Sequence, residues 1–322
     1  MTDARQVLPT DLLALVSYNG RSYKNEAWTR ERLGSEASQN TLGLVLDQFL
    51  AFARGRSAWI SVRRQRLQGL VGARQRGGRS AWEIDYLIDA TPDKDAVGGL
   101  LECAIAEVGK SGAEKLFLRI ESCSEIETVV RSAGFLPYQE EVLYAREQAF
   151  LSPGSGQSRN NEQAPAVAMR LVEPADSYAL FRLYNAATPE VIRRSEAATF
   201  GEWHASQERR WLRHGVQLLA EENGQITAAT RAARLPQGIL VDFTSNNGPE
   251  KAVAVIEAAL GALEASNEPI FVIVPASAEG VARRLETSGF RPRQQFVSLV
   301  CRTTRPLSLP KLVPAVAKSV GV

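Results

Sequence analysis

The chain has 322 residues, 44% of them hydrophobic, and its 38 basic residues nearly balance 36 acidic ones. This composition excludes a disordered chain, and the formal net charge of +2 gives no field that would attract nucleic acid. No apolar run approaches the roughly 20 residues that a membrane-spanning helix needs, and the N-terminus lacks the basic start and apolar core of a signal peptide. We therefore expect a cytoplasmic, soluble protein with neither a membrane nor a nucleic acid as its partner.

The first half of the chain predicts helical structure followed by a meander of strands. The segment 25–53 has a helical pattern, and the residues after it alternate as strands do. Residues 63–79 are rich in arginine, which fits either a hairpin with solvated arginines or an edge that binds an anionic ligand; we favour the hairpin. The elements expected in order are three strands at 58–64, 67–75 and 81–89, a helix at 95–112, a buried strand at 115–120, a helix ending at Gly134 and Phe135, and a last strand at 140–146.

The second half of the chain predicts the same elements in the same order. Its helices, strands and helix ends are expected at 176–195, 199–213, 216–222, 225–233, 239–245, 249–266, 269–275, Gly289–Phe290 and 296–302. Three pairs of residues keep a nearly constant spacing between the halves, as an internal repeat would. The spacing is 155 residues for two of the pairs and 157 for the third: Gly69 with Gly224, Gly134 with Gly289, and Asp85 with Asp242.

Residues 151–166 separate the two copies. This segment is rich in Ser, Gly, Pro, Asn and Gln, a composition typical of a flexible linker. The chain is therefore expected to consist of one domain at 1–150, the linker, a second domain at 167–305 and a Pro-containing tail at 306–322. The expected fold class is α/β, with a mixed sheet in which an antiparallel meander leads into a β-α-β crossover.

The cysteines and histidines form no pattern typical of a metal site. The three cysteines are odd in number and scattered, without a C-x-x-C pair. His204 and His214 are the only histidines and have no neighbouring ligand pattern. We expect no metal, no disulfide framework and no Ser-His-Asp triad.

The order of these elements resembles the GNAT N-acetyltransferase superfamily. The resemblance covers both copies, so the chain looks like a tandem GNAT protein, with "SAGF" and "TSGF" each ending the helix that follows the fifth strand. It implies acetyl-CoA as co-substrate and a small-molecule or peptide amine as acceptor. The alternative that the resemblance leaves open is a non-catalytic GNAT-fold protein that binds acyl-CoA or another protein.

The resemblance places the acyl-CoA phosphates at the start of the helix after the fourth strand, where helix N–H groups favour anions. The family motif there is Q/R-x-x-G-x-G/A. In the first copy its three positions fall on Asp93, Ala96 and Gly98, with Lys94, Val97 and Gly99 as neighbours in the same turn. Asp93 departs from the motif, and an ordinary capped helix start is the alternative interpretation.

The corresponding turn of the second copy matches the motif less well. Only Gly248 is available there, and it is followed by Pro249 and the acidic Glu250. We therefore expect acyl-CoA in the first copy and regard the second copy as a degenerate partner.

The catalytic groups implied by the resemblance lie on and after the fourth strand of the first copy. Alternation along 81–89 places Glu83 and Asp85 on one face, where mutual repulsion would raise a pKa and produce a general base. Glu83 is preferred over Asp85, and a solvated strand face is the alternative. The tyrosine that the family often uses as general acid is replaced by Val130 and Leu285, which leaves Tyr138 as a substitute acid.

Overall fold

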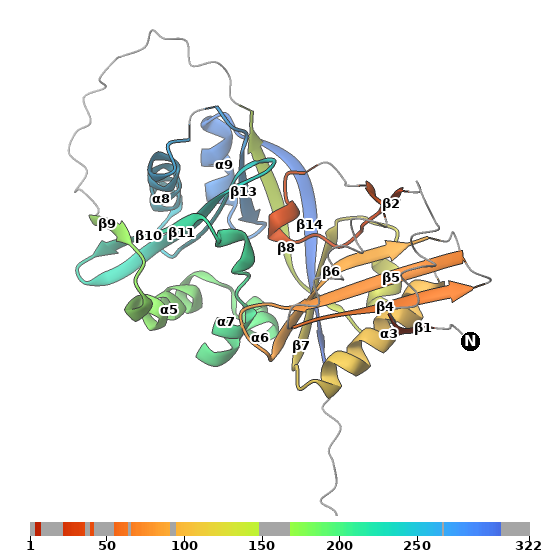
Figure 1. Cartoon of the computed structure of the whole chain (residues 1–322). Helices are drawn as coiled ribbons and strands as arrows, with labels where there is room; N and C mark the ends of the chain where they lie inside the picture. Colours follow the sequence, from red (N-terminus) through yellow and green to blue (C-terminus); the bar gives the residue numbers. More distant parts are fainter. Residues whose placement is uncertain are drawn as a thin grey trace, which may run out of the picture.

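The computed structural model describes residues 4–7, 22–35, 39–41, 55–63, 66–90, 95–147, 168–265 and 267–303. Its central feature is a 12-stranded sheet that runs through both halves of the chain (Figure 1). The strands of this sheet lie in the order β1-β4-β5-β6-β7-β14-β8-β13-β12-β11-β10-β9. A mixed α/β fold was predicted, and this sheet confirms it.

The first half contributes a meander followed by a crossover, as the sequence pattern predicts. The elements are β1 (Ala4–Gln6), β4 (Arg56–Arg63), β5 (Arg66–Gln75), β6 (Ala81–Asp89), α3 (Asp95–Lys110), β7 (Lys115–Glu121), α4 (Glu127–Ser132) and β8 (Leu136–Arg146). Strands β4, β5 and β6 pair antiparallel, and β6 pairs parallel with β7 after α3. A separate small sheet joins β2 (Ser22–Lys24) to β3 (Gln39–Thr41), and a 3-10 turn, η1, covers Arg30–Arg32.

The second half repeats this arrangement behind three short helices. The elements are β9 (Ala168–Leu171), η2 (Pro174–Asp176), α5 (Ser177–Ala187), α6 (Glu190–Glu196), α7 (Phe200–Ser206), η3 (Arg210–Leu212), β10 (Gly215–Glu222), β11 (Gln225–Leu235), β12 (Gly238–Ser245), α8 (Pro249–Ala262), β13 (Ile270–Pro275), α9 (Glu279–Thr287) and β14 (Arg291–Arg302). Strand β12 pairs antiparallel with β11 and parallel with β13.

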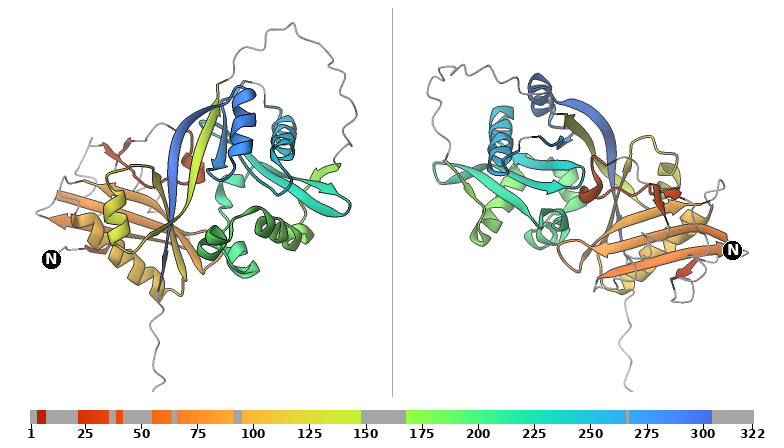
Figure 2. Two further views of the ribbon diagram at one scale, coloured as in Figure 1. Left: turned by 180° about the vertical axis from the view of Figure 1, so that it is seen from behind. Right: turned by 45° about the horizontal axis from the view of Figure 1, so that its top comes forward.

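The two halves exchange their last strands. Strand β8, which ends the first half, pairs with β13 of the second half over Glu141–Arg146. Strand β14, which ends the second half, pairs with β7 of the first half over Phe296–Arg302, and β8 and β14 pair with each other. In Figure 2 the blue ribbon of β14 accordingly extends from α9 into the first half. Each half thus completes the sheet of the other.

A hydrophobic cluster at this junction draws residues from both halves. Trp28 and Phe296 lie with their ring centroids 5.3 Å apart, and Phe271 of β13 belongs to the same cluster. All three side chains are at most 1% exposed. The apolar side chains at the junction are therefore as inaccessible to solvent as those of a domain core.

The two glycines that prompted the repeat hypothesis have the conformation expected of helix ends. Gly134 has φ +97° and Gly289 has φ +87°, a left-handed region that glycine adopts without steric cost. The next residue in each case donates its N–H back into the helix, Phe135 to Val130 and Phe290 to Leu285. Such bonds terminate a helix and turn the phenylalanine into the core.

Two sequence predictions about the elements are wrong. The segment 25–53 does not form the predicted helix where it is described: residues 25–29 are not helical, Arg30–Arg32 form only the short η1, and 39–41 form β3, while 36–38 and 42–54 lie outside the described residues. Gly69 lies inside β5, whereas Gly224 is in the turn between β10 and β11 with φ +74°, so these two glycines are not equivalent. The linker 151–166 and the tail 306–322 also lie outside the described residues.

Candidate functional site

The sheet opens between two parallel strands in each half. In the first half, β6 and β7 pair only from Ala81 to Glu83, and the space beyond is called here the first gap. In the second half, β12 and β13 pair only from Ile239 to Val241, and the space beyond is the second gap. Both gaps lie beside the start of the helix that connects the two strands, α3 in the first half and α8 in the second.

The first gap is filled by residues 25–28 of the same chain. The Glu26 N–H donates to the Leu87 carbonyl on β6 at 2.9 Å, and the Trp28 N–H donates to the Arg119 carbonyl on β7 at 2.8 Å. Asn25 forms a bridge to Ile88. This segment therefore occupies the backbone positions that an added strand would use.

The Asn25 side chain forms three hydrogen bonds, two to β6 and one within the segment. Its amide nitrogen donates to the Asp85 carbonyl at 3.0 Å, and its oxygen accepts from Leu87 N and Ala27 N at 2.9 and 3.0 Å. Asn25 is only 1% exposed. A fully bonded, buried amide makes this contact a specific feature of the fold.

A bulge in β6 separates the two candidate acids. Ala73 pairs with Ile84 and Gly72 with Tyr86, so Asp85 is the extra residue opposite β5. The alternation predicted for 81–89 therefore breaks at Asp85. Trp82 and Ile84 pack with α3 as expected, but Tyr86 and Ile88 belong to a different hydrophobic cluster.

Glu83 and Asp85 are both buried and paired with arginines. Glu83 accepts from Arg74 Nε at 2.6 Å and from Arg76 Nε at 3.2 Å. Asp85 pairs with Arg56 and lies 3.8 Å from Arg74 Nε. Burial raises the pKa of Glu83, Arg74 and Arg76 act against that rise, and Glu208 adds to it. Both acids are thus held in a buried ion-pair network rather than facing an open cleft.

The predicted phosphate-binding turn is described only in part. Asp93 and Lys94 lie outside the described residues. Ala96 and Val97 are buried in the first turns of α3, and a side chain at Gly69 would meet Val97 Cγ2 at 3.8 Å. Gly98 and Gly99 are half-buried on the same helix.

Tyr138 lines the cavity of the second half, and Glu83 is not among the residues that line it. Tyr138 is on β8, and its ring contacts Phe117 edge-on with centroids 6.1 Å apart. Burial and the charge of Glu196 raise the pKa of Tyr138.

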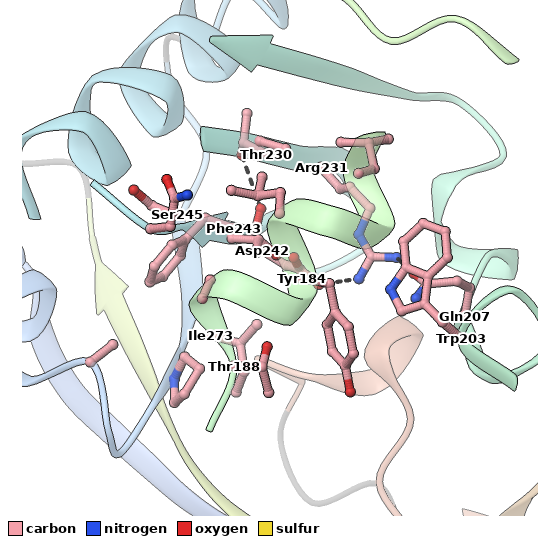
Figure 3. Close-up of a pocket in the computed structure, with 18 of the residues that line it drawn as sticks. Tyr184, Thr188, Trp203, Gln207, Thr230, Arg231, Asp242, Phe243, Ser245 and Ile273 are labelled. Carbon is pink, nitrogen blue, oxygen red and sulfur yellow. Dashed lines mark hydrogen bonds and ion pairs between the residues drawn. The ribbon is translucent and has the colours of Figure 1, made fainter. Parts of the chain in front are cut away.

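The second gap opens into a cavity of about 940 Å³, called here the second-half cavity. Its walls come from α5, α6 and α7, from β11, β12 and β13, and from β8 of the first half. Residues that line it include Tyr138, Tyr184, Thr188, Glu196, Trp203, Gln207, Thr230, Arg231, Asp242, Phe243, Ser245, Ile273, Ser277 and Gly280. Figure 3 shows Phe243 and Ser245 on β12 at one side of the cavity, with Tyr184, Trp203 and Gln207 on the helical side.

The β12 backbone offers hydrogen-bonding groups to the second gap. Ile239 donates its N–H to the Pro269 carbonyl, on the β13 side of the strand. Because backbone groups alternate along a strand, Phe243 and Ser245 direct their N–H and C=O groups to the same side. In the described part of the chain, no strand pairs with β12 beyond Val241 on that side. The second gap is therefore open where the first is filled.

The start of α8 is less suited to an anion than the open strand edge. Gly248 has φ +87° and keeps the turn compact, but Pro249 has no N–H to donate. Glu250 occupies the first helical turn and pairs with Arg284 at 2.8 Å on the surface. An anion at this helix start would meet the Glu250 carboxylate.

Buried ion pairs form the wall between the cavity and the first half. Arg119 of β7 donates to Glu141 at 2.8 Å and to Glu208 at 3.0 Å. Arg30, in η1 just after the segment that fills the first gap, has its Nη1 atom 2.8 Å from Asp242 Oδ2. This wall links the filled gap of the first half to the open gap of the second.

Sequence reasoning missed Glu196, which also lines the cavity. Its carboxylate accepts from the Tyr184 hydroxyl at 3.0 Å, and burial raises its pKa. Glu196 is on α6 and Tyr184 on α5, neither of which carries a family motif. The one sequence signal for this contact is that Tyr184 and Glu196 are only 12 residues apart, on two consecutive helices.

Two further features of the described residues bear on the kind of site. They contain no cluster of three or more His, Cys, Asp and Glu side chains placed to hold a metal ion. In the same residues, no helix has the length and apolar character required to cross a membrane.

The sequence and the structure were compared with those of known proteins. No family model and no curated protein matches the sequence. A GCN5-related N-acetyltransferase from Sphaerobacter thermophilus is similar in structure, with a TM-score of 0.56 and 14% identity over 93% of this chain and 95% of that one. A tandem GNAT protein from the clavulanic acid biosynthesis pathway gives a TM-score of 0.54 and 10% identity over 94% and 99% of the two chains. The repeated order of elements and these two likenesses together show that the chain has the GNAT N-acetyltransferase fold in a tandem arrangement.

Proposed function

We propose that this protein is an acyl-CoA-dependent N-acyltransferase whose site lies in the second half, in the second gap and the cavity behind it. Acetyl-CoA is the expected co-substrate, and the acceptor is an amine of a small molecule or a peptide. This proposal places the site in the opposite half from the one that the sequence motifs favour.

One observation carries the proposal, namely the difference between the two gaps. Residues 25–28 occupy the first gap with backbone hydrogen bonds to both of its strands. The second gap leaves the β12 edge open from Phe243 onward and leads into a 940 Å³ cavity. A cavity of that size is within the usual range for small-molecule sites.

The residues of the second gap fit the co-substrate unevenly. The open edge at Phe243 and Ser245 suits an extended amide-containing arm, which would pair with β12 as an added strand does. The start of α8 suits the phosphates less well, because Glu250 occupies its first turn. The Glu250–Arg284 pair lies on the surface, where such pairs contribute little to stability. Arg284, the partner of Glu250, and Lys251, its neighbour in the first turn of α8, would then be the cations proposed for the phosphates.

The direct test uses the full-length chain and a matched pair of bulky substitutions. Ser277→Trp places a large side chain on an exposed position at the mouth of the second gap. Ser122→Trp makes the corresponding change at a half-buried position just after β7, beside the first gap. We expect calorimetry to show one acetyl-CoA per wild-type chain, loss of binding in Ser277→Trp and retention in Ser122→Trp.

The reverse result would return the site to the first half, with Asp93, Ala96 and Gly98 as the phosphate turn. Acetyl-CoA binding without thiol release across a panel of primary amines would favour the non-catalytic alternative. An absence of binding to the wild-type chain would overturn the proposal altogether.

A further inference from the structure

We propose that Glu196 is the base that takes the proton from the acceptor, a primary amine that enters the second-half cavity as an ammonium ion against the rings of Tyr184 and Trp203. This inference rests on the proposed function and adds to it a catalytic residue and an acceptor class.

Glu196 differs from two other acids that line the cavity, Glu141 and Asp242, in having no ion-pair partner. Glu141 and Asp242 each form an ion pair with an arginine within 3 Å. For Glu196, by contrast, the described residues provide no ion pair, and the Tyr184 hydroxyl is its hydrogen-bond partner. Glu196 is half-buried, and a carboxylate that is partly removed from water without an ion-pair partner is costly to maintain, so a cationic ligand would be favoured beside it.

The backbone around Glu196 is held in place from the first half. Lys115 of β7 donates its ammonium to the Glu196 carbonyl at 2.9 Å and to the Glu202 carboxylate at 2.9 Å. The Ala197 N–H donates to Arg193 and closes the end of α6, and Ala197 is fully buried. The position of the carboxylate is therefore fixed rather than left to a mobile loop.

The charges that face Glu196 come from several elements. Burial is the largest influence and raises its pKa, and Glu141 of β8 acts in the same direction. Arg76, the Tyr184 hydroxyl and Arg30 act in the opposite direction. A carboxylate with a raised pKa accepts a proton more readily near neutral pH than an ordinary glutamate does.

Two tyrosines adjoin this carboxylate. Tyr138 lies close enough that the charge of Glu196 raises its pKa, and burial and Glu196 together raise the pKa of Tyr184. Both hydroxyls thus stay protonated at neutral pH and can donate hydrogen bonds. Tyr138 comes from the first half and Tyr184 from the second, so this group of side chains exists only in the assembled chain.

Aromatic rings form the wall beside the carboxylate. The Tyr184 and Trp203 rings have centroids 6.4 Å apart, and Phe181 packs against both. Figure 3 shows Tyr184 projecting into the cavity on the same side as Trp203. The faces of such rings attract ammonium groups. The combination of a lone carboxylate and aromatic faces indicates a primary ammonium rather than an anionic acceptor group.

The proton and electron balance of the step is as follows. The ammonium gives one proton to the Glu196 carboxylate and becomes a neutral amine. Its lone pair attacks the thioester carbonyl, a C–N bond forms and the C–S bond breaks. The sulfur leaves with the second nitrogen proton, and Glu196 returns its proton to water.

The test compares Glu196→Gln with Glu190→Gln in the full-length protein. Both residues lie on α6 and lose the same charge, but Glu190 is exposed and pairs with Arg194 on the surface. With acetyl-CoA and a panel of butylamine, phenethylamine and a lysine peptide, Glu196→Gln should lower kcat about 10²–10⁴-fold. Its loss should shrink as the pH rises, because free amine then becomes available, whereas Glu190→Gln should match the wild type.

A second variant distinguishes a base from a structural carboxylate. Tyr184→Phe removes a hydrogen bond that lowers the pKa of Glu196, so the acidic limb of the pH–rate profile should move to higher pH. An unchanged rate in Glu196→Gln, or an unchanged limb in Tyr184→Phe, would overturn the inference while leaving acetyl-CoA binding in the second gap intact. Wild-type protein that binds acetyl-CoA but acylates no amine of the panel would also overturn it. No binding by the wild type would instead reject the proposed function.

Discussion

At the scale of single residues, Glu250 places a negative charge where a phosphate would bind. Its carboxylate lies in the first turn of α8 beside Gly248, and Arg284 holds it there. We predict that Glu250→Gln tightens acetyl-CoA binding, because it removes repulsion at a helix start that otherwise favours anions. The gain should be about two- to fivefold at low salt and should fade as salt is added.

The matched control for this prediction is Glu279→Gln. Glu279 occupies the first turn of the neighbouring helix α9 and is also exposed. Calorimetric titration of both variants would measure the effect. Weaker binding in Glu250→Gln would mean that the carboxylate supports the ligand or its helix rather than opposing it.

Loss of Arg119 should lower the stability of the protein strongly. Its guanidinium is 4% exposed and neutralises two buried acids, Glu141 and Glu208. Arg119→Met would leave both acids buried without this partner, so the free energy of unfolding should fall by about 3–5 kcal/mol. Urea denaturation measures the change. Arg131→Met, which breaks an exposed pair on α4, should alter stability by less than about 1 kcal/mol.

The same ion pairs should make the protein sensitive to acid. Arg119 and Arg30 lower the pKa of Glu141, Arg119 and Arg76 lower that of Glu208, and burial opposes both shifts. A lowered folded-state pKa contributes stability above the ordinary glutamate value of 4.5, and that stability is lost as the pH falls below it. We therefore expect the free energy of unfolding to decrease steadily from about pH 4.5 downward.

Arg119→Met provides the check on this pH dependence. Without the arginine, the pKa of Glu141 and of Glu208 should return toward or above the ordinary value. The decrease of stability with falling pH should then be shallower than in the wild type. The free energy of unfolding can be measured by urea denaturation at several pH values from 6 to 3. If it falls with pH equally steeply in the variant and the wild type, other groups control the acid response.

At the scale of elements, the segment that fills the first gap should act as part of the sheet. Asn25→Ala would remove three buried hydrogen bonds and leave Leu87 N–H and Ala27 N–H without this acceptor. We predict a loss of about 2–4 kcal/mol in the free energy of unfolding. Asn185→Ala, which removes one partly exposed hydrogen bond to Arg193, is the matched control and should cost less than about 1 kcal/mol.

Acetyl-CoA binding by the Asn25→Ala variant tests further which of the two gaps holds the ligand. If the second gap holds the co-substrate, this variant should still bind one acetyl-CoA with wild-type affinity. A second equivalent of bound acetyl-CoA would mean that the segment 25–28 blocks a functional site that it can vacate.

At the scale of the whole molecule, the exchange of last strands should make unfolding cooperative across both halves. Each half needs a strand of the other to complete its sheet, and the junction cluster around Trp28 and Phe296 is dry. We predict a single calorimetric transition for the intact chain. Phe296→Ala should lower stability by about 3–5 kcal/mol without dividing that transition. Two resolved peaks would mean that each half is stable without the other.

The sequence could predict the order of elements because that order depends on local patterns. Gly134 and Gly289 could be predicted to end a helix because a glycine after a helical pattern readily adopts the left-handed conformation that terminates it. The buried strands at 115–120 and 269–275 follow from near-continuous apolar runs. Each such pattern is set by neighbours in the sequence, so the repeated α/β order could be identified without coordinates.

Only the tertiary structure decided which gap is open, because that depends on contacts between distant residues. Asn25 meets β6 across 60 residues, and Lys115 meets the end of α6 across 81. The helix pattern was misleading for residues 25–28 for the same reason, since their hydrogen bonds to β6 and β7 outweigh a modest helix propensity. By itself, therefore, the sequence determined a repeated fold, whereas long-range pairing filled one gap, left the other open and joined Tyr138 of one half to Glu196 of the other.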